Sequence, residues 1–461
     1  MRTFATPEEK RRYLTEQPVQ RLILELAVPS IISMLITSFY NMADTYFVGR
    51  IGTSATAAVG VVFPLMSIIQ ALGFTFGHGS GNYISRALGK GETENAQRMA
   101  TVGFVSAFAA GALFGIIALL FLDGVVNLLG ATPTIAPYAK EYSRFILMGA
   151  PFMTASLLLN NQLRFQGSTF YGMIGMGVGA VLNIALDPLF IFVLDMGVAG
   201  AAIATIISQI VSFCLLLHGC TRGGNIAIDI RRFKPSLRVY AEILRGGAPS
   251  LFRQGLGSVA TICLNVAAGV YGDAAIAGMS IVTRVMMFAN SAIIGIGQGF
   301  QPVCGFNYGA RRYDRVRKAF WFLVVLAFCV LTVFSVVGII AAPDIISIFR
   351  KDDPMVTQVG ALSLQLQCIV FPLSAFIVAA NMMLQTIGMP VRASLSAISR
   401  NGLFFVPAIL ILPGIFDLLG VQMSQAIADV LSFALCIFLV RPVLRQMKRM
   451  EAEGTANDAG K

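Results

Sequence analysis

Two aspartates fall inside long apolar segments of the sequence, where a charged side chain is expensive. Asp44 lies in the segment 22–49, and Asp187 lies in the segment 170–194. Asn183 precedes Asp187 by four residues, so both side chains project from one face of a helix. If segments 170–194 and 197–219 form an antiparallel hairpin, Thr205 reaches a depth similar to that of Asp187. Ionisable residues in such places are functional candidates by default.

Asp44, Asn183, Asp187 and Thr205 together offer oxygen atoms suited to a hard cation. Sodium prefers oxygen ligands by the logic that governs other hard cations, and in that case these four residues are the metal ligands. Two neighbouring carboxylates can also share one proton. We therefore predict a site for sodium or a proton, with no other cofactor. The alternative is that the four side chains only fill polar gaps between helices.

Five more ionisable residues lie in apolar segments and form a second set of polar candidates. Asp429 is either a second proton site or the ion-pair partner of one of the arginines Arg253, Arg284 and Arg400. The arginines either neutralise Asp429 and helix carbonyls or line a cavity that favours anions. His78 has glycines on both sides, so it either titrates near neutral pH or packs among small residues.

The elements that carry these residues are membrane-spanning helices. The chain has 461 residues, of which 56% are apolar and only 12% are charged, whereas a soluble chain carries about 25% charged residues. At roughly 20 residues per span, the length allows about a dozen transmembrane helices. Twelve apolar segments are visible: 22–49, 56–84, 97–122, 143–163, 170–194, 197–219, 246–270, 275–305, 318–342, 357–386, 393–416 and 419–440.

The basic residues predict the orientation of these spans. With the N-terminus inside, the internal loops and both tails hold 26 of the 34 lysines and arginines. The opposite face holds five, namely Arg50, Lys140, Arg144, Arg350 and Lys351. Positive charge accumulates in cytoplasmic loops, so we expect both termini in the cytoplasm. The same bias accounts for the net charge of +11 without a nucleic acid partner.

The two halves of the chain read as a repeat. A shift of 220 residues lays Pro29-Ser30 on Pro249-Ser250 and matches further glycines at 52 and 272, 77 and 297, 79 and 299, and 89 and 309. Each half holds six spans, so both halves point the same way, as in transporters whose lobes are related by an axis along the membrane normal. We predict an N-terminal segment 1–20, an N-lobe 21–219, a loop 220–245, a C-lobe 246–445 and a disordered cytoplasmic tail 446–461.

The repeat does not extend to the predicted cation site. Asp44 aligns with Leu264 in the second half, so the N-lobe alone holds the paired acids. Pro29 lies on the same segment as Asp44 and frees a backbone carbonyl within it. It forms either a static kink or a hinge that responds to the cation. The seven cysteines are scattered without a CxxC pair, which favours free thiols over disulfides or a metal site.

With these features assembled, the chain resembles the multidrug and toxic compound extrusion (MATE) family over residues 20–445. The resemblance rests on the strings LAVPSIISMLITSFYNMADTYFVGRIG, ISRALGKG, LLNNQLRFQGS, GAVLNIALDP, GVAGAAIATIISQ and GFNYGARR, in that order. It implies an all-α polytopic membrane protein with twelve helices in two six-helix lobes. In the DinF-like branch, residues that match Asp44, Asn183, Asp187 and Thr205 form the cation site of the N-lobe. The seventh-span acid of the NorM-like branch is absent, since SLFRQGLGSVATICLN has only Arg253.

The resemblance implies efflux of amphipathic compounds by alternating access, driven by inward flow of sodium or protons. We expect a monomer in the bacterial cytoplasmic (inner) membrane, with a small amphipathic substrate and the lipid bilayer as its partners. A flippase or exporter of lipid-linked or anionic substrates is the alternative that the arginines keep open. A membrane-embedded enzyme is less consistent with the sequence, which holds no HExxH, GxSxG or phosphate-binding loop, and we predict no catalytic residues.

Overall fold

The computed structural model describes residues 4–349 and 353–459. Within these ranges the chain is almost entirely helical and contains no β-strand. Two of the five basic residues expected on the outer face, Arg350 and Lys351, lie outside the described residues.

The first half of the chain contains six long helices and several shorter elements. Its elements are α1 (Pro7–Glu16), α2 (Val19–Gly49), α3 (Thr53–Lys90), α4 (Thr93–Leu120), α5 (Leu122–Leu128), α6 (Ala136–Phe165), α7 (Thr169–Pro188), the π-helical turn η1 (Leu189–Val193), α8 (Gly197–Cys220) and the 3-10 turn η2 (Ile230–Arg232).

The second half repeats this plan with two of its spans interrupted. Its elements are α9 (Leu237–Gly269), α10 (Asp273–Gly309), α11 (Tyr313–Ile340), α12 (Ala342–Phe349), α13 (Pro354–Val370), η3 (Phe371–Leu373), α14 (Ser374–Thr386), α15 (Pro390–Ile398), the π-helical turn η4 (Ser399–Phe404), α16 (Phe405–Ile411) and α17 (Pro413–Ala459).

Each of the twelve predicted apolar segments coincides with a helix or a helix pair. Among the described residues, eleven of these spans are long and apolar enough to cross a membrane. The twelfth, α9, is long enough at 33 residues, but Arg253, Gln254 and Asn265 reduce its hydropathy. The prediction of an all-helical, polytopic fold is therefore confirmed.

The helix boundaries follow the predicted repeat. Helix α4 begins at Thr93 and ends at Leu120, and α11 begins and ends 220 residues later, at Tyr313 and Ile340. The short helix α5 has its counterpart in α12 at the same offset. Matching boundaries at such spacing indicate two copies of one six-span unit, although few side chains are shared between them.

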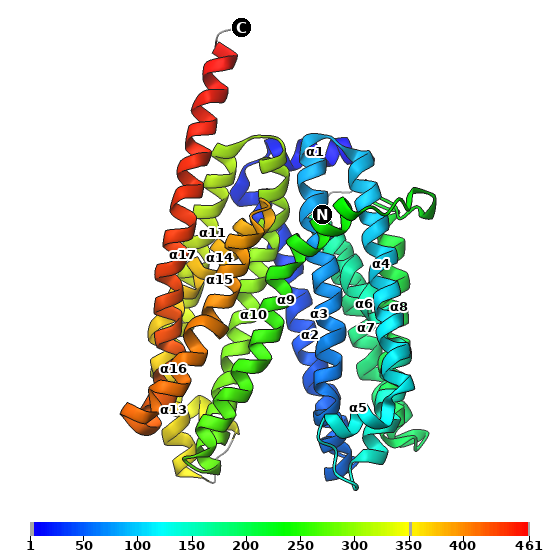
Figure 1. The fold of residues 1–461 in the computed structure, drawn as a ribbon, viewed down its shortest axis with the longest axis vertical. Coiled ribbons are helices and arrows are strands. Elements are labelled where there is room, and N and C mark those ends of the chain that lie inside the picture. Colours follow the sequence, from blue (N-terminus) through cyan, green and yellow to red (C-terminus); the bar gives the residue numbers. More distant parts are fainter. Residues whose placement is uncertain (1–3, 350–352, 460–461) are drawn as a thin grey trace. The chain divides into compact units, whose positions relative to one another are not determined.

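The chain divides into two compact units. Unit 1 contains residues 1–16 and 25–247, and unit 2 contains residues 17–24 and 248–461. In unit 1, α6 packs against α3, α4 and α8, and α7 packs against α8. In unit 2, α10 packs against α11, α13 and α14. Figure 1 shows the helices of each unit running side by side. The predicted loop 220–245 belongs to unit 1, whereas the first turn of α2 belongs to unit 2.

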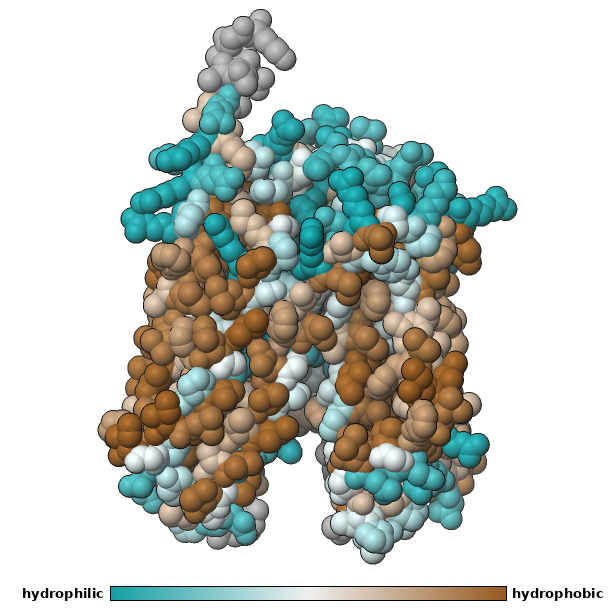
Figure 2. Space-filling model, viewed as in Figure 1, coloured by the Kyte–Doolittle hydropathy of each residue, from teal (hydrophilic) through white to brown (hydrophobic). Residues whose placement is uncertain are grey.

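The surface of both units is apolar over the middle of the helices. Large hydrophobic side chains face outward there, for example Leu113 at 60% exposure, Val325 at 59% and Phe328 at 47%. Figure 2 shows hydrophobic residues over this middle zone and hydrophilic residues at the helix ends. Exposed apolar patches of this extent fit a lipid environment rather than water.

The prediction of a disordered tail at 446–461 is wrong for the described part of that segment. Helix α17 continues through it to Ala459. Gln446, Lys448, Arg449 and Glu451 are good helix formers, and a helix that already exists extends without a new nucleation step. Residues 460 and 461 lie outside the described residues.

Candidate functional site

The close packing of α7 on α8 positions one half of the predicted cation site. A Cβ atom added at Gly179 would lie 1.8 Å from Ser212 Oγ and 2.9 Å from the Ser208 carbonyl oxygen. Only glycine allows so close an approach of the two helices. As a result, polar side chains one helical turn further along each helix meet in the interior of unit 1.

Asn183 is the residue that joins the two helices. Its Nδ2 donates to Asp187 Oδ1 at 3.3 Å and to Thr205 Oγ1 at 3.4 Å. All three side chains are buried, with at most 1% exposure. The structure thus brings Asn183, Asp187 and Thr205 together at one depth, as an antiparallel hairpin requires.

Asp44 comes to the same place from α2. It is close enough to Asp187 to act on it electrostatically. Tyr40, one turn earlier on α2, lies beside Thr205 and has both aspartates as charged neighbours. Tyr142 of α6 is fully buried and is a neighbour of Tyr40 and of both acids. The sequence reasoning missed both tyrosines, although Tyr40 stands at the i−4 position from Asp44.

Three oxygen atoms of this cluster have no hydrogen-bond donor among the described residues. They are Asp44 Oδ1, Asn183 Oδ1 and Asp187 Oδ2, and all three are buried. A buried acceptor without a donor loses its hydration and gains nothing in exchange. A bound proton or a small cation would satisfy these oxygen atoms. The cluster therefore contains the kind of oxygen ligands that the sequence suggests for either ion.

The oxygen atoms of the cluster indicate which kind of cation it could bind. The cluster presents carboxylate, amide and hydroxyl oxygens, which suit a hard ion or a proton. No group of three or more histidine, cysteine, aspartate or glutamate side chains that could hold a metal occurs in the described parts of the chain.

Pro188 shapes the end of α7 next to the cluster. Proline has no backbone N–H and its ring collides with the preceding turn, and directly after it the chain forms the π-helical turn η1. The Leu194 N–H donates to the Leu189 carbonyl, five residues back, at 2.9 Å. Such π-turns recur at functional sites, and this one begins two residues after Asp187.

Asp429 is engaged in an ion pair. Arg400 donates to both of its carboxylate oxygens, with Nε to Oδ1 at 2.8 Å and Nη2 to Oδ2 at 3.0 Å. Gln425 Nε2 also donates to Oδ1 at 2.9 Å. Of the three arginines that the sequence offered as partners, the structure selects Arg400. Arg253 and Arg284 form no ion pair with any described residue.

His78 lies in a different part of unit 1, in contact with Arg164. Its Nδ1 is 3.1 Å from the Phe74 carbonyl oxygen, and its Nε2 is 3.0 Å from Arg164 Nη2. A carbonyl only accepts and a guanidinium only donates. Nδ1 therefore carries the hydrogen and Nε2 accepts. A second proton would have to face the arginine, so the geometry favours a structural role for His78.

Comparisons with known proteins agree with this architecture. The sequence model of the MatE family matches residues 29–189 and 249–410. The multidrug export protein MepA of Staphylococcus saprophyticus is 29% identical over 468 residues, which cover 97% of this chain and 100% of the relative.

Two solved structures match almost the whole chain. One is a MOP superfamily transporter from Pyrococcus furiosus whose binding pocket is described as having reverse polarity; the identity is 26%, the TM-score 0.90, and the coverage 97% of this chain and 100% of the other. The second is an outward-facing multidrug resistance MATE transporter of the same superfamily, with 26% identity, a TM-score of 0.89 and the same coverage.

Proposed function

We propose that this chain, which belongs to the MatE family of membrane transporters, exports small amphipathic compounds in exchange for a cation. The relatives it matches are transporters rather than enzymes. One of them carries the name of a multidrug export protein, which supports amphipathic compounds as the substrate class. Cation exchange rests on the geometry of unit 1.

The observation that carries the proposal is the group of three unsatisfied oxygens on Asp44, Asn183 and Asp187. Asn183 donates to one oxygen of Asp187, and the other oxygen is buried without a donor among the described residues. A proton or a sodium ion placed there binds both aspartates at once, and Thr205 and Tyr40 complete the polar lining. The cation neutralises charge that is expensive in a low-dielectric interior.

This site drives transport only if its affinity differs between two conformations. Asp44 stands on α2 and Asp187 on α7, so any change in the separation of these helices alters the site. Pro29, inside α2, interrupts the hydrogen bonds of the helix that carries Asp44. We assign Pro29 the role of hinge, by which cation binding and release reshape α2 during alternating access.

A second candidate substrate class is anionic. Arg253 and Arg284 have no ion-pair partner among the described residues, and one solved relative is described as having reverse polarity in its binding pocket. An exporter of anionic or lipid-linked compounds would use such positive groups to attract its substrate. The test below therefore includes an anionic dye beside a cationic one.

Transport in proteoliposomes tests the proposal. We expect efflux of ethidium when a sodium or proton gradient is imposed, and at least a tenfold loss in Asp44→Asn and in Asp187→Asn. Asp123→Asn is the matched control, because Asp123 is exposed and its carboxylate lies at the surface, 2.7 Å from Lys140 Nζ. Full gradient-driven efflux by either site variant would refute the assignment, and export of the anionic dye alone would favour the second candidate.

Asn183→Ala separates binding of the cation from its translocation. The amide oxygen is one of the unsatisfied acceptors and the amide nitrogen holds Asp187 in place. We therefore expect a roughly tenfold weaker apparent cation affinity with the maximal rate retained, equivalent to about 1.4 kcal/mol. The exposed Asn127 on α5 gives the control Asn127→Ala, which should leave the affinity unchanged.

A further inference from the structure

A cavity of about 670 Å³ lies at one end of unit 2, and none of its lining residues belongs to the cation cluster. Its walls come from two segments that are far apart in the sequence. Pro18, Val19 and Gln20 form one wall at the start of α2, and the first turns of α11 form the other. Its volume falls within the range of about 300–1,000 Å³ that small-molecule sites occupy.

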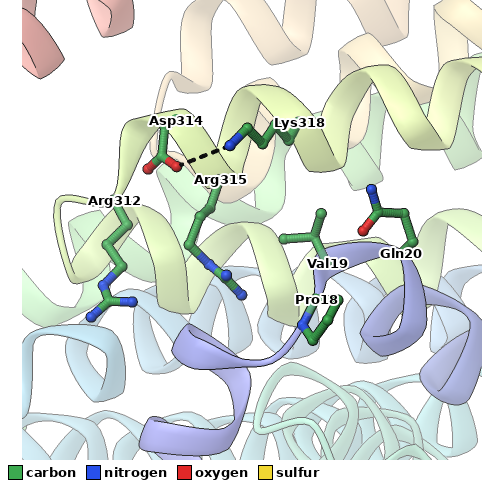
Figure 3. Close-up of a pocket in the computed structure, with 7 residues that line it drawn as sticks. All are labelled: Pro18, Val19, Gln20, Arg312, Asp314, Arg315 and Lys318. Atoms are coloured by element: carbon green, nitrogen blue, oxygen red, sulfur yellow. Dashed lines mark ion pairs between the residues drawn. The ribbon is translucent and has the colours of Figure 1, made fainter.

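The wall formed by α11 is strongly basic. It contributes Arg312, Arg315 and Lys318 and a single acid, Asp314. Asp314 Oδ2 lies 3.6 Å from Lys318 Nζ, and Figure 3 shows this pair together while the two guanidinium groups extend toward the turn before α2. The acid is thus turned toward the lysine, and the cavity has an excess of positive charge.

Two helices also begin at this cavity. Helix α2 starts at Val19 and α11 starts at Tyr313, and the N-terminus of a helix attracts anions through its free N–H groups and its dipole. Arg315 holds the two segments together, because its Nε donates to Asn307 at 2.7 Å and its Nη2 donates to the Gln17 carbonyl. The basic wall therefore has a fixed position relative to the start of α2.

The equivalent place in unit 1 is built differently. By the 220-residue offset, Arg312 and Asp314 correspond to Glu92 and Glu94 at the start of α4. There the segment 227–236 covers the helix: Arg232 pairs with Glu94 at 3.5 Å, and Arg98 donates to the Lys234 carbonyl at 2.9 Å. Unit 1 thus has two glutamates at this position, whereas unit 2 has mostly basic side chains around a cavity.

We propose that this basic cavity binds the phosphodiester headgroup of an anionic phospholipid. Its polar groups match a phosphate, which takes bidentate hydrogen bonds from arginine and a point charge from lysine. Basic pockets at the ends of transmembrane helices are suited to such headgroups. The lipid would fasten the start of α2 to α11, and α2 is the helix that carries Asp44.

The level of the cavity favours a lipid over a soluble phosphate compound. Both helices that form it become membrane spans at this point, Val19–Gly49 and Tyr313–Ile340. Trp321, one turn beyond Lys318, is 50% exposed, and tryptophan is enriched at the level of lipid headgroups. A phospholipid can place its phosphate in the cavity while its acyl chains remain beside α11.

Trp321 also supplies the measurement, since it is the only tryptophan of the chain. We expect brominated phosphatidylglycerol, titrated into phosphatidylcholine nanodiscs, to quench its fluorescence saturably, and native mass spectrometry to retain one phosphatidylglycerol. Brominated phosphatidylcholine should quench only in proportion to its fraction. Arg312→Gln combined with Lys318→Gln should weaken binding at least tenfold, at about fivefold per charge. Asp314→Asn should tighten it.

The control variant removes the same charge from the same end of unit 2. Arg445 and Lys448 are exposed on α17, and α17 lies beside the start of α11, because Arg317 pairs with Glu451 at 2.8 Å. Arg445→Gln combined with Lys448→Gln should leave the quenching curve unchanged. An equal loss of phosphatidylglycerol affinity in both double variants, or no loss of affinity in either, would overturn the site. Competition by glycerol 3-phosphate or inorganic phosphate at millimolar concentration would overturn the lipid as its occupant.

Discussion

Asp44 and Asp429 are both aspartates in apolar helices, but their surroundings differ in charge and in hydrogen bonding. Asp429 receives two hydrogen bonds from Arg400 and one from Gln425. Asp44 has a buried oxygen with no donor among the described residues. A carboxylate that a guanidinium already neutralises is a poor ligand for a second cation, whereas an unsatisfied one is a good ligand. This contrast supports our proposal that the cation binds in unit 1.

Removing the charge of Asp429 should therefore affect stability more than coupling. Asp429→Asn leaves the Arg400 guanidinium largely buried without its counter-ion, and breaking such a pair typically destabilises a protein by about 3–5 kcal/mol. We expect a lower thermal unfolding midpoint in detergent, with cation-dependent efflux retained. The double variant Asp429→Asn with Arg400→Gln should regain part of the midpoint. A variant with a normal midpoint and no cation dependence would instead assign coupling to Asp429.

Lys10 gives a second prediction at the scale of one residue. Lys10 is 2% exposed, and its ammonium group donates to Ser168 Oγ at 2.7 Å and to Asn225 Oδ1. Burial lowers the pKa of Lys10 from 10.5 to about 7. Between these values the unfolded chain binds more protons than the folded one, so the Lys10 contribution to stability rises with pH.

The pH dependence of unfolding checks this assignment. The difference in thermal midpoint between wild type and Lys10→Met should shift in favour of wild type as pH rises from about 7 to about 10. Lys90, which is exposed at the end of α3, provides the control Lys90→Met. If the difference in thermal midpoint between wild type and Lys10→Met did not change over this pH range, the lowered pKa of Lys10 would be contradicted.

Sequence spacing located part of the candidate site but not its full extent. Asn183, Asp187 and Thr205 could be placed together because a hairpin fixes their relative depth. The tyrosines were missed because a tyrosine in an apolar helix carries no signal that distinguishes a polar contact from packing. The sequence also could not identify which arginine pairs with Asp429. Depth along a helix does not determine which of three arginine-bearing helices lies opposite.

Among the elements, the pair α7 and α8 holds Asn183, Asp187 and Thr205 of the proposed cation site together. Gly179→Ala places a methyl group within 2.9 Å of the Ser208 carbonyl and still closer to Ser212 Oγ, so the helices must separate. The hydrogen bonds of Asn183 to Asp187 and Thr205 are already 3.3 and 3.4 Å long, and a small displacement breaks the second. We expect several-fold weaker cation dependence of efflux.

Gly177→Ala is the matched control for this prediction. It lies on the same helix, and its added Cβ meets only Ile36 Cδ1 at 3.5 Å, which is an ordinary contact. Its efflux should match wild type. If both alanine variants behaved alike, the effect would come from helix propensity and not from the spacing of α7 and α8.

The long helices were easier to predict from sequence than the short ones. A membrane span needs about 20 apolar residues, and that length gives a strong signal, so the centres of the twelve spans were found. Helices α5 and α12 have only 7 and 8 residues, too few to span a membrane, and they fall almost entirely between the predicted apolar segments. The end of α17 was assigned to disorder because polar composition was given more weight than the continuity of a helix.

At the scale of the whole molecule, the distribution of positive charge predicts how the chain lies in the membrane. Of the 34 lysines and arginines, 26 fall in the loops and tails assigned to one face, and five fall on the other. Figure 2 shows hydrophilic side chains at both ends of the apolar zone, so hydropathy alone does not distinguish the faces. The sign of the charge does.

Labelling with an impermeant thiol reagent checks this orientation. Lys234→Cys lies in the segment between the two lobes and is exposed, and Thr134→Cys lies in the exposed turn between α5 and α6. In intact cells we expect labelling at position 134 and none at position 234 until the membrane is opened, with the seven native cysteines replaced beforehand. The charge argument requires both results together, because a flipped molecule would exchange them. Labelling at position 234 in intact cells would place the basic face outside. The lipid proposed for the cavity at α11 would then belong to the outer leaflet, and the cation proposed to bind Asp44 and Asp187 would enter from the opposite side.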